Sequence, residues 1–214
     1  MTSQLILDNH NFAEARTQVS DAVRSGAITV VAAEHGYVYI CDAFNRDRVS
    51  RIHALRGDAP FTAAQVMVSH ADVLKGVATD FDADLSRLTD RFWPGLLTLQ
   101  LTPHYGLSWN LGDEGELDYF AVRAPARELL RAVIELTGPV AVASAGQAGQ
   151  GAVRSLSEIP SLAADIAIVV DEGQLPDGQL STLIGRSSQG GLRVIREGAI
   201  SRVQLAELVP TIGA

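Results

Sequence analysis

The chain is poor in residue types that carry much of protein chemistry, with one cysteine, one lysine and two tryptophans among 214 residues. A single cysteine, Cys41, excludes an internal disulfide. The sequence also lacks an apolar run of about 18 residues, so we expect no membrane span. Residues 1–8 lack the basic and apolar regions of a signal peptide. We therefore expect a cytoplasmic protein.

Lys75 is the only lysine, so arginine supplies nearly all of the 17 basic residues. A bound phosphate would have to be held by planar guanidinium groups, whose hydrogen-bond geometry differs from that of an ammonium. The formal net charge is −8, so no general attraction to nucleic acids or anionic membranes is expected. Contact with tRNA or double-stranded RNA would need a local basic surface, and we expect such binding to be weak.

Apolar residues make up 47% and charged residues 20% of the chain, as in soluble globular proteins. Strand-length apolar stretches alternate with amphipathic, helix-length stretches, which predicts a single α/β domain over residues 1–214. Residues 105–117 form the longest expected loop. Strands are predicted at 4–7, 28–33, 65–69, 96–101, 119–123, 140–144, 166–170 and near Leu183 and Val194. Helices are predicted at 12–24, after an N-cap at Asn45, as two short helices within 70–92, from Pro125 to Leu136, around 157–164, and after a capping box of Ser201 and Gln204.

A glycine-rich loop follows the predicted strand 140–144, beginning at Ser144 and containing Gly146, Gly149 and Gly151. Glycine has no Cβ and tolerates positive φ, so backbone N–H groups in such a loop can approach an anion closely. Ligand-binding loops of α/β proteins also follow apolar strands. An ordinary glycine-rich turn is the alternative. We hypothesise an anion site formed by this loop with Arg56 and Arg123.

Several further motifs follow one another in a specific order along the chain. They are Glu34 with Tyr37, Arg56-Gly57-Asp58, Trp93-Pro94-Gly95, Arg123-Ala124-Pro125, the Ser144 loop, Ser181-Thr182 and Arg196-Glu197-Gly198. In order and spacing the chain resembles the YrdC-like family, the threonylcarbamoyl-adenylate synthases and their relatives.

The resemblance implies a YrdC-like twisted mixed sheet flanked by helices, in a single domain with a concave cavity. It also implies a nucleotidyltransferase-type reaction that uses ATP with Mg²⁺, L-threonine and bicarbonate to make threonylcarbamoyl-AMP for a tRNA modification. The C-terminal extension domain of longer members is expected to be absent.

Three family motifs are altered in this sequence. The family's Pro-Thr-x-Thr-x-Tyr-Gly-Leu has lost both threonines, and His35 stands at one of them. Its Lys-x-Arg appears as Arg56-Gly57-Asp58, and its Ser-x-Asn as Ser144-Ala145-Gly146. A carboxylate at position 58 opposes a triphosphate by roughly 4 kcal/mol, for unit charges about 4 Å apart at an effective dielectric constant of about 20. A bridging metal ion would relieve this repulsion; alternatively, Asp58 faces solvent.

The ligand-binding candidates are Glu34, His35, Tyr37, Arg56, Asp58, Arg123, Ser144, Gly146, Gly149, Ser181, Thr182 and Arg196. His35 is either a general base or hydrogen-bond donor, or a residue that fills the space of the lost threonines. Arg123 contacts either an anion or a buried acid. We expect no metal site, and no nucleophilic role for Cys41, which is predicted to follow a buried strand.

The sequence therefore leaves three functions open. The first is an enzyme of the threonylcarbamoyl-AMP synthase type, of which the altered motifs predict little activity. The second is a paralogue that binds another nucleotide or a small anion in the same cavity. The third is a non-catalytic module that binds double-stranded RNA or a protein partner.

Overall fold

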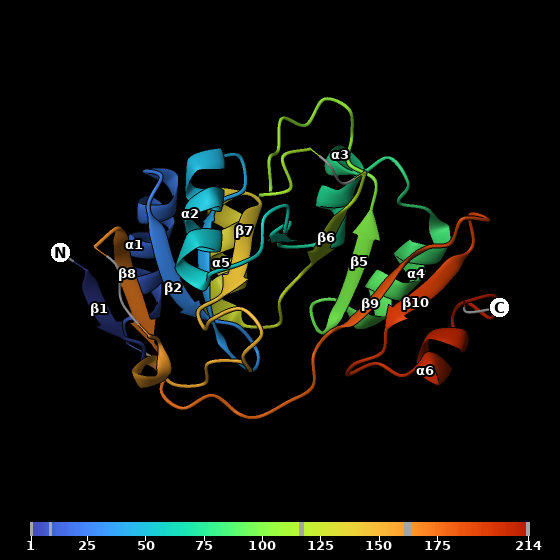
Figure 1. Ribbon diagram of the computed structural model, residues 1–214. Helices are drawn as coiled ribbons and strands as arrows, with labels where there is room; N and C mark the ends of the chain where they lie inside the picture. Colours follow the sequence, from blue (N-terminus) through green and yellow to red (C-terminus); the bar gives the residue numbers. More distant parts are fainter. Residues whose placement is uncertain (1, 9, 116–117, 161–163, 213–214) are drawn as a thin grey trace.

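A computed structural model of the chain describes residues 2–8, 10–115, 118–160 and 164–212. The strands of these residues form a twisted mixed sheet in the order β1-β8-β2-β3-β7-β4-β6-β5-β9-β10. In this order they span Ser3–Ile6, Ile166–Asp171, Ile28–Ala32, Tyr37–Asp42, Val140–Ser144, Gln65–Met67, Phe120–Arg123, Leu97–Leu101, Thr182–Arg186 and Leu192–Arg196. The predicted α/β fold is confirmed. Figure 1 shows two halves of the sheet, with a long connection from β8 to β9 running below both.

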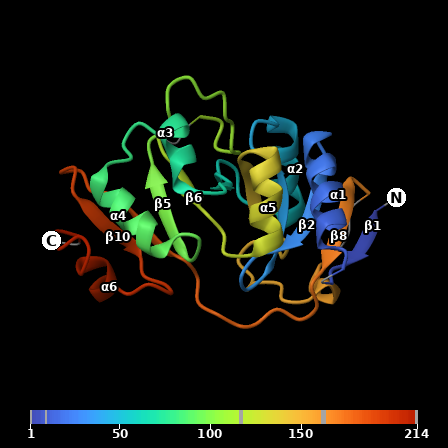
Figure 2. The same ribbon diagram turned by 180° about the vertical axis from the view of Figure 1, so that it is seen from behind.

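The half of the sheet around β2 and β3 is covered on both faces. Successive side chains of a strand point to opposite faces. Accordingly Val31 packs with α1 (Phe12–Arg24) and α5 (Glu128–Thr137), whereas Val30 belongs to the core that includes α2 (Arg46–Arg56). Helices α1 and α5 lie together in front of these strands in Figure 2. This arrangement explains why β2 is buried along its whole length and is apolar except for Thr29.

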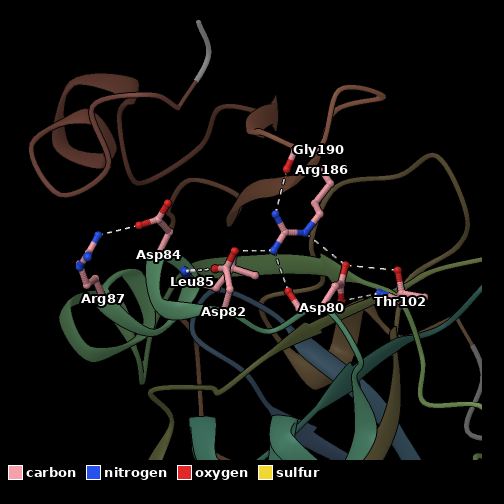
Figure 3. A network of polar contacts seen from close by, with 8 residues as sticks. All are labelled: Asp80, Asp82, Asp84, Leu85, Arg87, Thr102, Arg186 and Gly190. Carbon is pink, nitrogen blue, oxygen red and sulfur yellow. Dashed lines mark hydrogen bonds and ion pairs between the residues drawn. The ribbon is translucent and has the colours of Figure 1, made fainter.

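The other half carries α4 (Ala83–Phe92) and α6 (Arg202–Ala206), besides the short 3-10 helix η1 (Ala71–Val73) and α3 (Leu74–Val77). Figure 3 shows how Arg186 of β9 connects the sheet to the segment that leads into α4. Its guanidinium donates to Asp82 Oδ2 at 2.7 Å and to the carbonyl of Asp80 at 2.8 Å. Asp82 is also the N-cap of α4 and accepts from the N–H of Leu85. The network fixes the start of α4 against the sheet.

The predicted helix starts are mostly confirmed. Helix α1 has the predicted bounds, the Asn45 side chain accepts from the Arg48 N–H, and the capping box of Ser201 and Gln204 is present. The two short helices predicted within 70–92 are present as α3 and α4, and the 3-10 helix η1 directly precedes α3. None of the helices in the described part of the chain has the length and hydropathy of a membrane span.

Three predictions need correction. Helix α5 begins at Glu128 rather than at Pro125, because the N–H of Ala126 is used to donate to Glu34 and Arg127 remains extended. Cys41 lies within β3 instead of after a strand. Around 157–164 the structure has only the 3-10 helix η2 (Leu156–Glu158), and residues 161–163 lie outside the described ranges.

Candidate functional site

The cavity that is lined by most of the candidate residues has a volume of about 400 Å³ and lies between the two halves of the sheet. Its floor consists of side chains that share one face of neighbouring strands. The floor pairs are Val38 with Ser144, Val142 with Gln65, Met67 with Arg123, and Thr98 with Leu183. Met67 and Val142 also pack in the core beneath α1 and α5.

Four segments form the walls of this cavity. They are the turn between β2 and β3 with Glu34 and His35, the end of α2 and the loop to β4, the end of the β8–β9 connection at 179–181, and Arg196. Ser144 belongs to the floor. Most predicted site residues thus meet in one place, although they come from separate parts of the sequence.

Glu34 and Arg123 form a buried ion pair in the cavity wall. Arg123 Nη1 donates to Glu34 Oε1 at 2.6 Å, and the side chains are 8% and 11% exposed for Arg123 and Glu34 respectively. Burial alone would raise the pKa of Glu34, but the hydrogen bond and charge of Arg123, with the N–H of Ala126, hold that pKa below its usual value of 4.5. Of the two interpretations of Arg123, the ion pair with a buried acid is the one present. The Oε2 atom of Glu34 is buried without a hydrogen-bond partner.

Asp58 lines the cavity and is not turned to solvent, since its side chain is only 6% exposed. Its Oδ2 lies 2.8 Å from Nδ1 of His53. Its Oδ1 lies 3.4 Å from Nε of Arg56. The expectation that Asp58 opposes an anion with a full, uncompensated charge therefore has to be reconsidered, because two cationic or protonatable groups contact it.

A chain of polar groups lines the side of the cavity near β5 and β9. Gln65 donates to Thr98 Oγ1 at 3.1 Å, and Thr98 donates to Ser181 Oγ at 2.7 Å. Arg196 Nη2 donates to the Ser181 carbonyl at 2.9 Å. Thr182, by contrast, is fully buried, and its hydroxyl bonds to backbone groups of Gly198 and Ile200. Thr182 thus supports the turn after β10 instead of facing the cavity.

Tyr37 and His35 both contact residues of the connection between β8 and β9. The Tyr37 hydroxyl donates to the Gly173 carbonyl at 2.8 Å and accepts from the Glu172 N–H at 2.9 Å. Burial raises the pKa of Tyr37, so the phenol stays neutral. The His35 ring lies against Gly178, where an added Cβ would come within 2.3 Å of it. The Nδ1 atom of His35 is buried without a hydrogen-bond partner.

The glycine-rich loop lies beside the cavity. Gly146 lines an adjoining hollow of about 310 Å³, and Ala152 borders both spaces. Gly149, at φ +78°, shapes the turn. The N–H of Gly146 donates to Ser144 Oγ at 3.3 Å, and that of Ala148 to the Arg56 carbonyl at 2.9 Å.

These bonds correct the expectation that the loop keeps its backbone donors for an anion, because part of them is already used within the protein. The bond from the Ala148 N–H nevertheless connects this loop to Arg56, the last residue of α2.

Metal binding and cysteine chemistry find no support in the described residues. No group of three or more His, Cys, Asp or Glu side chains within 2–8, 10–115, 118–160 and 164–212 is arranged to hold a metal ion. Cys41 is fully buried, and burial raises the pKa of its thiol to about 12. The thiol is therefore protonated and inert at neutral pH.

Sequence reasoning missed His53, Gln65 and Thr98, which also line the cavity. The contact of His53 with Asp58 could have been predicted from Gly57. A glycine directly after a helix adopts the left-handed conformation, and here φ is +73°. The chain then turns back over the last helical turn, which places Asp58 on His53.

Comparisons with known proteins support the family and the fold. The sequence model of the Sua5, YciO and YrdC proteins, described as telomere recombination, matches residues 21–198. A threonylcarbamoyl-AMP synthase from Stutzerimonas stutzeri is 28% identical over 194 residues, which cover 86% of this chain and 95% of that protein. The synthase from Pyrococcus abyssi is 28% identical over 164 residues, covering 76% of this chain and 48% of the relative.

The solved structure of P. abyssi Sua5 in complex with L-threonine shares the fold. Its TM-score is 0.85 at 23% identity, and the match covers 100% of this chain and 62% of that one. The chain spans about half the length of the P. abyssi synthase, but nearly the whole length of the S. stutzeri one.

Proposed function

The chain belongs to the Sua5, YciO and YrdC family, and from that premise we propose that its cavity binds ATP. We further propose that an L-threonine-sized amino acid occupies the same cavity, and that the protein synthesises threonylcarbamoyl-AMP slowly. Both relatives described above are named threonylcarbamoyl-AMP synthases.

The observation that carries ATP binding is the position of Arg56. Its side chain lines the cavity, its backbone carbonyl accepts from the glycine-rich loop, and its Nε is buried without a hydrogen-bond partner. A guanidinium in this state gains a charge-assisted hydrogen bond when a phosphate arrives. Ser144 on the floor and Ser181 and Arg196 on the wall of the cavity add donors. The volume of this cavity, about 400 Å³, is within the usual range for small-molecule sites.

Mg²⁺ in this proposal arrives with the nucleotide. Magnesium keeps several waters and is commonly held by substrate phosphates with one or two carboxylates. The cavity carboxylates of Glu34 and Asp58 already contact Arg123 and His53. These residues therefore fit a phosphate-borne ion better than a resident one.

Slow synthesis follows from the groups that remain to orient the amino acid. Arg123 is engaged by Glu34, and the Tyr37 hydroxyl is engaged by the backbone. Gln65, Thr98 and Ser181 remain, and they bond to one another. Bringing a carbamate to the α-phosphate of ATP depends on accurate positioning. Because few side chains remain free to orient the amino acid, the rate of threonylcarbamoyl-AMP synthesis should be low.

Two measurements test the proposal. Isothermal titration with ATP and Mg²⁺ should give saturable binding, and its absence would refute the nucleotide site. Pyrophosphate release that depends on threonine and bicarbonate should be well below that of the S. stutzeri relative. Release at an equal rate would overturn the second half of the proposal, and a preference for another nucleotide in the same titration would favour the paralogue hypothesis.

We also propose that the chain acts as a single domain in the cytoplasm, where tRNA is modified. Binding of tRNA or double-stranded RNA is weak, because the net charge is −8 and two arginines of α2, Arg46 and Arg51, already pair with Glu114 and Asp165.

A further inference from the structure

His53 lies between two hydrogen-bond acceptors. Its Nδ1 is 2.8 Å from Oδ2 of Asp58, and its Nε2 is 2.8 Å from the carbonyl oxygen of Leu111. A carbonyl only accepts, so Nε2 must carry a proton. A neutral imidazole would then present the lone pair of Nδ1 to a carboxylate oxygen. The short contact between Nδ1 and Oδ2 requires a second proton between them.

We propose that His53 and Asp58 share this proton, so that the pair is electrically neutral and leaves the charge of Arg56 available to a bound anion. The proposal rests on the proposed function, since the anion is the ATP phosphate. Asp58 then acts as a positioning residue for His53, and the altered Arg-Gly-Asp motif keeps one net positive charge in the cavity wall.

The distances around Asp58 support this division. Charge-assisted N–H···O contacts are commonly about 2.7–2.9 Å. The contact of Asp58 with His53 has that length, whereas its contact with Arg56 is 3.4 Å and Nε of Arg56 makes no hydrogen bond. Asp58 is thus bound mainly to the histidine.

The His53 ring is fixed from both sides. Gly112 packs on it so closely that an added Cβ would lie 2.4 Å from Nε2 and 2.7 Å from the Thr62 carbonyl oxygen. The Leu111 carbonyl that holds Nε2 also accepts from the N–H of Ala64. The ring therefore cannot turn away from Asp58 without displacing the loop before β4.

Charge counting gives opposite predictions for the two single variants. Replacing Asp58 by Asn removes the carboxylate and the shared proton together, so Arg56 still supplies one positive charge. Replacing His53 by Gln leaves Asp58 as a carboxylate beside Arg56, and the net charge falls to zero. Combining the two substitutions restores the charge.

The test is titration of the four proteins with ATP and Mg²⁺ at neutral pH. Asp58→Asn should stay within about threefold of the wild type, His53→Gln should bind about tenfold more weakly or worse, and the double variant should return to within about threefold. Asp165→Asn, which removes a carboxylate paired with Arg51 of the same helix outside the cavity, is the matched control. A tenfold gain in Asp58→Asn, or a double variant as weak as His53→Gln, would overturn the proposal.

Nuclear magnetic resonance of the ¹⁵N-labelled histidine ring tests the shared proton without any ligand. We expect a low-field proton signal on Nδ1 of His53 in the wild type and its loss in Asp58→Asn. An unprotonated Nδ1 in the wild type refutes the proposal even if ATP binds. Conversely, absence of ATP binding with the proton present would refute only the proposed function.

Discussion

Removal of Arg123 should destabilise the protein strongly, because the residue compensates a carboxylate that has little access to water. In Arg123→Met the Glu34 side chain, 11% exposed, would keep the N–H of Ala126 at 2.8 Å but lose its cation at 2.6 Å. Breaking a buried ion pair by removing one partner costs about 3–5 kcal/mol. In a domain of this size about 1 kcal/mol corresponds to roughly 2–4 °C in Tm. We therefore expect Tm to fall by roughly 6–20 °C.

Thermal unfolding followed by circular dichroism at neutral pH measures this effect. The double variant Glu34→Gln with Arg123→Met is the matched control, because removing both members of a buried pair is often close to neutral. It should recover at least half of the lost stability. A loss below about 1 kcal/mol in Arg123→Met, or a double variant as unstable as the single one, would refute the role of the pair.

The stability lost in Arg123→Met should depend on pH in a definite direction. The pKa of Glu34 is lowered in the folded protein from its usual value of 4.5. Its contribution to stability is therefore present above pH 4.5 and is lost as the pH falls through the lower folded value. The difference between wild type and Arg123→Met should shrink in acid, since protonated Glu34 no longer needs a cation. A difference that is constant from neutral to acidic pH would contradict this account.

Three further predictions concern other parts of the molecule. Gly178→Ala should weaken ATP binding and lower Tm, because its Cβ would come within 2.3 Å of the His35 ring; adding His35→Ala should restore Tm, and no recovery would contradict the clash. Glu172→Gln should raise Tm by a few degrees at neutral pH, because burial raises the pKa of Glu172 in spite of its ion pair with Arg127 at 3.2 Å, and its stabilising contribution, complete below pH 4.5, is lost as the pH rises through the folded value. That gain should vanish in acid, and a loss of Tm at every pH would be inconsistent with it. Ser201→Ala removes the capping box of α6 and should cost about 1 kcal/mol in chemical denaturation, whereas an unchanged midpoint would show that α6 needs no cap.

The elements that the sequence predicts well are those whose signal is local. The apolar periodicity of α1 gives its bounds, and Asn45 and Ser201 mark helix starts by side-chain hydrogen bonds to residues three positions on. Helix α5 was predicted too early because Pro125 is a common first helical residue. Only the distant Glu34, which accepts from Ala126, shows that the chain stays extended there.

The meeting of the candidate residues in one cavity can be predicted in part, for the same reason. Family-like motifs bring Glu34, Arg56, Arg123 and Ser144 to one cavity, as the resemblance implies. The state of their charges depends on contacts between residues far apart in sequence, such as Glu34 with Arg123, which no local pattern specifies. The contact of Asp58 with His53 joins residues only five positions apart, but it depends on the left-handed turn at Gly57.

The most direct test of a phosphate site at Arg56 is ATP titration of Arg56→Gln beside Arg51→Gln. Both arginines belong to α2, but Arg51 pairs with Asp165 outside the cavity. A hydrogen bond to a charged group contributes about 1.5–3 kcal/mol, so Arg56→Gln should weaken binding by about 10- to 100-fold, and Arg51→Gln should bind like the wild type. Equal affinities of the two variants, or no binding of ATP by the wild type, would contradict the account.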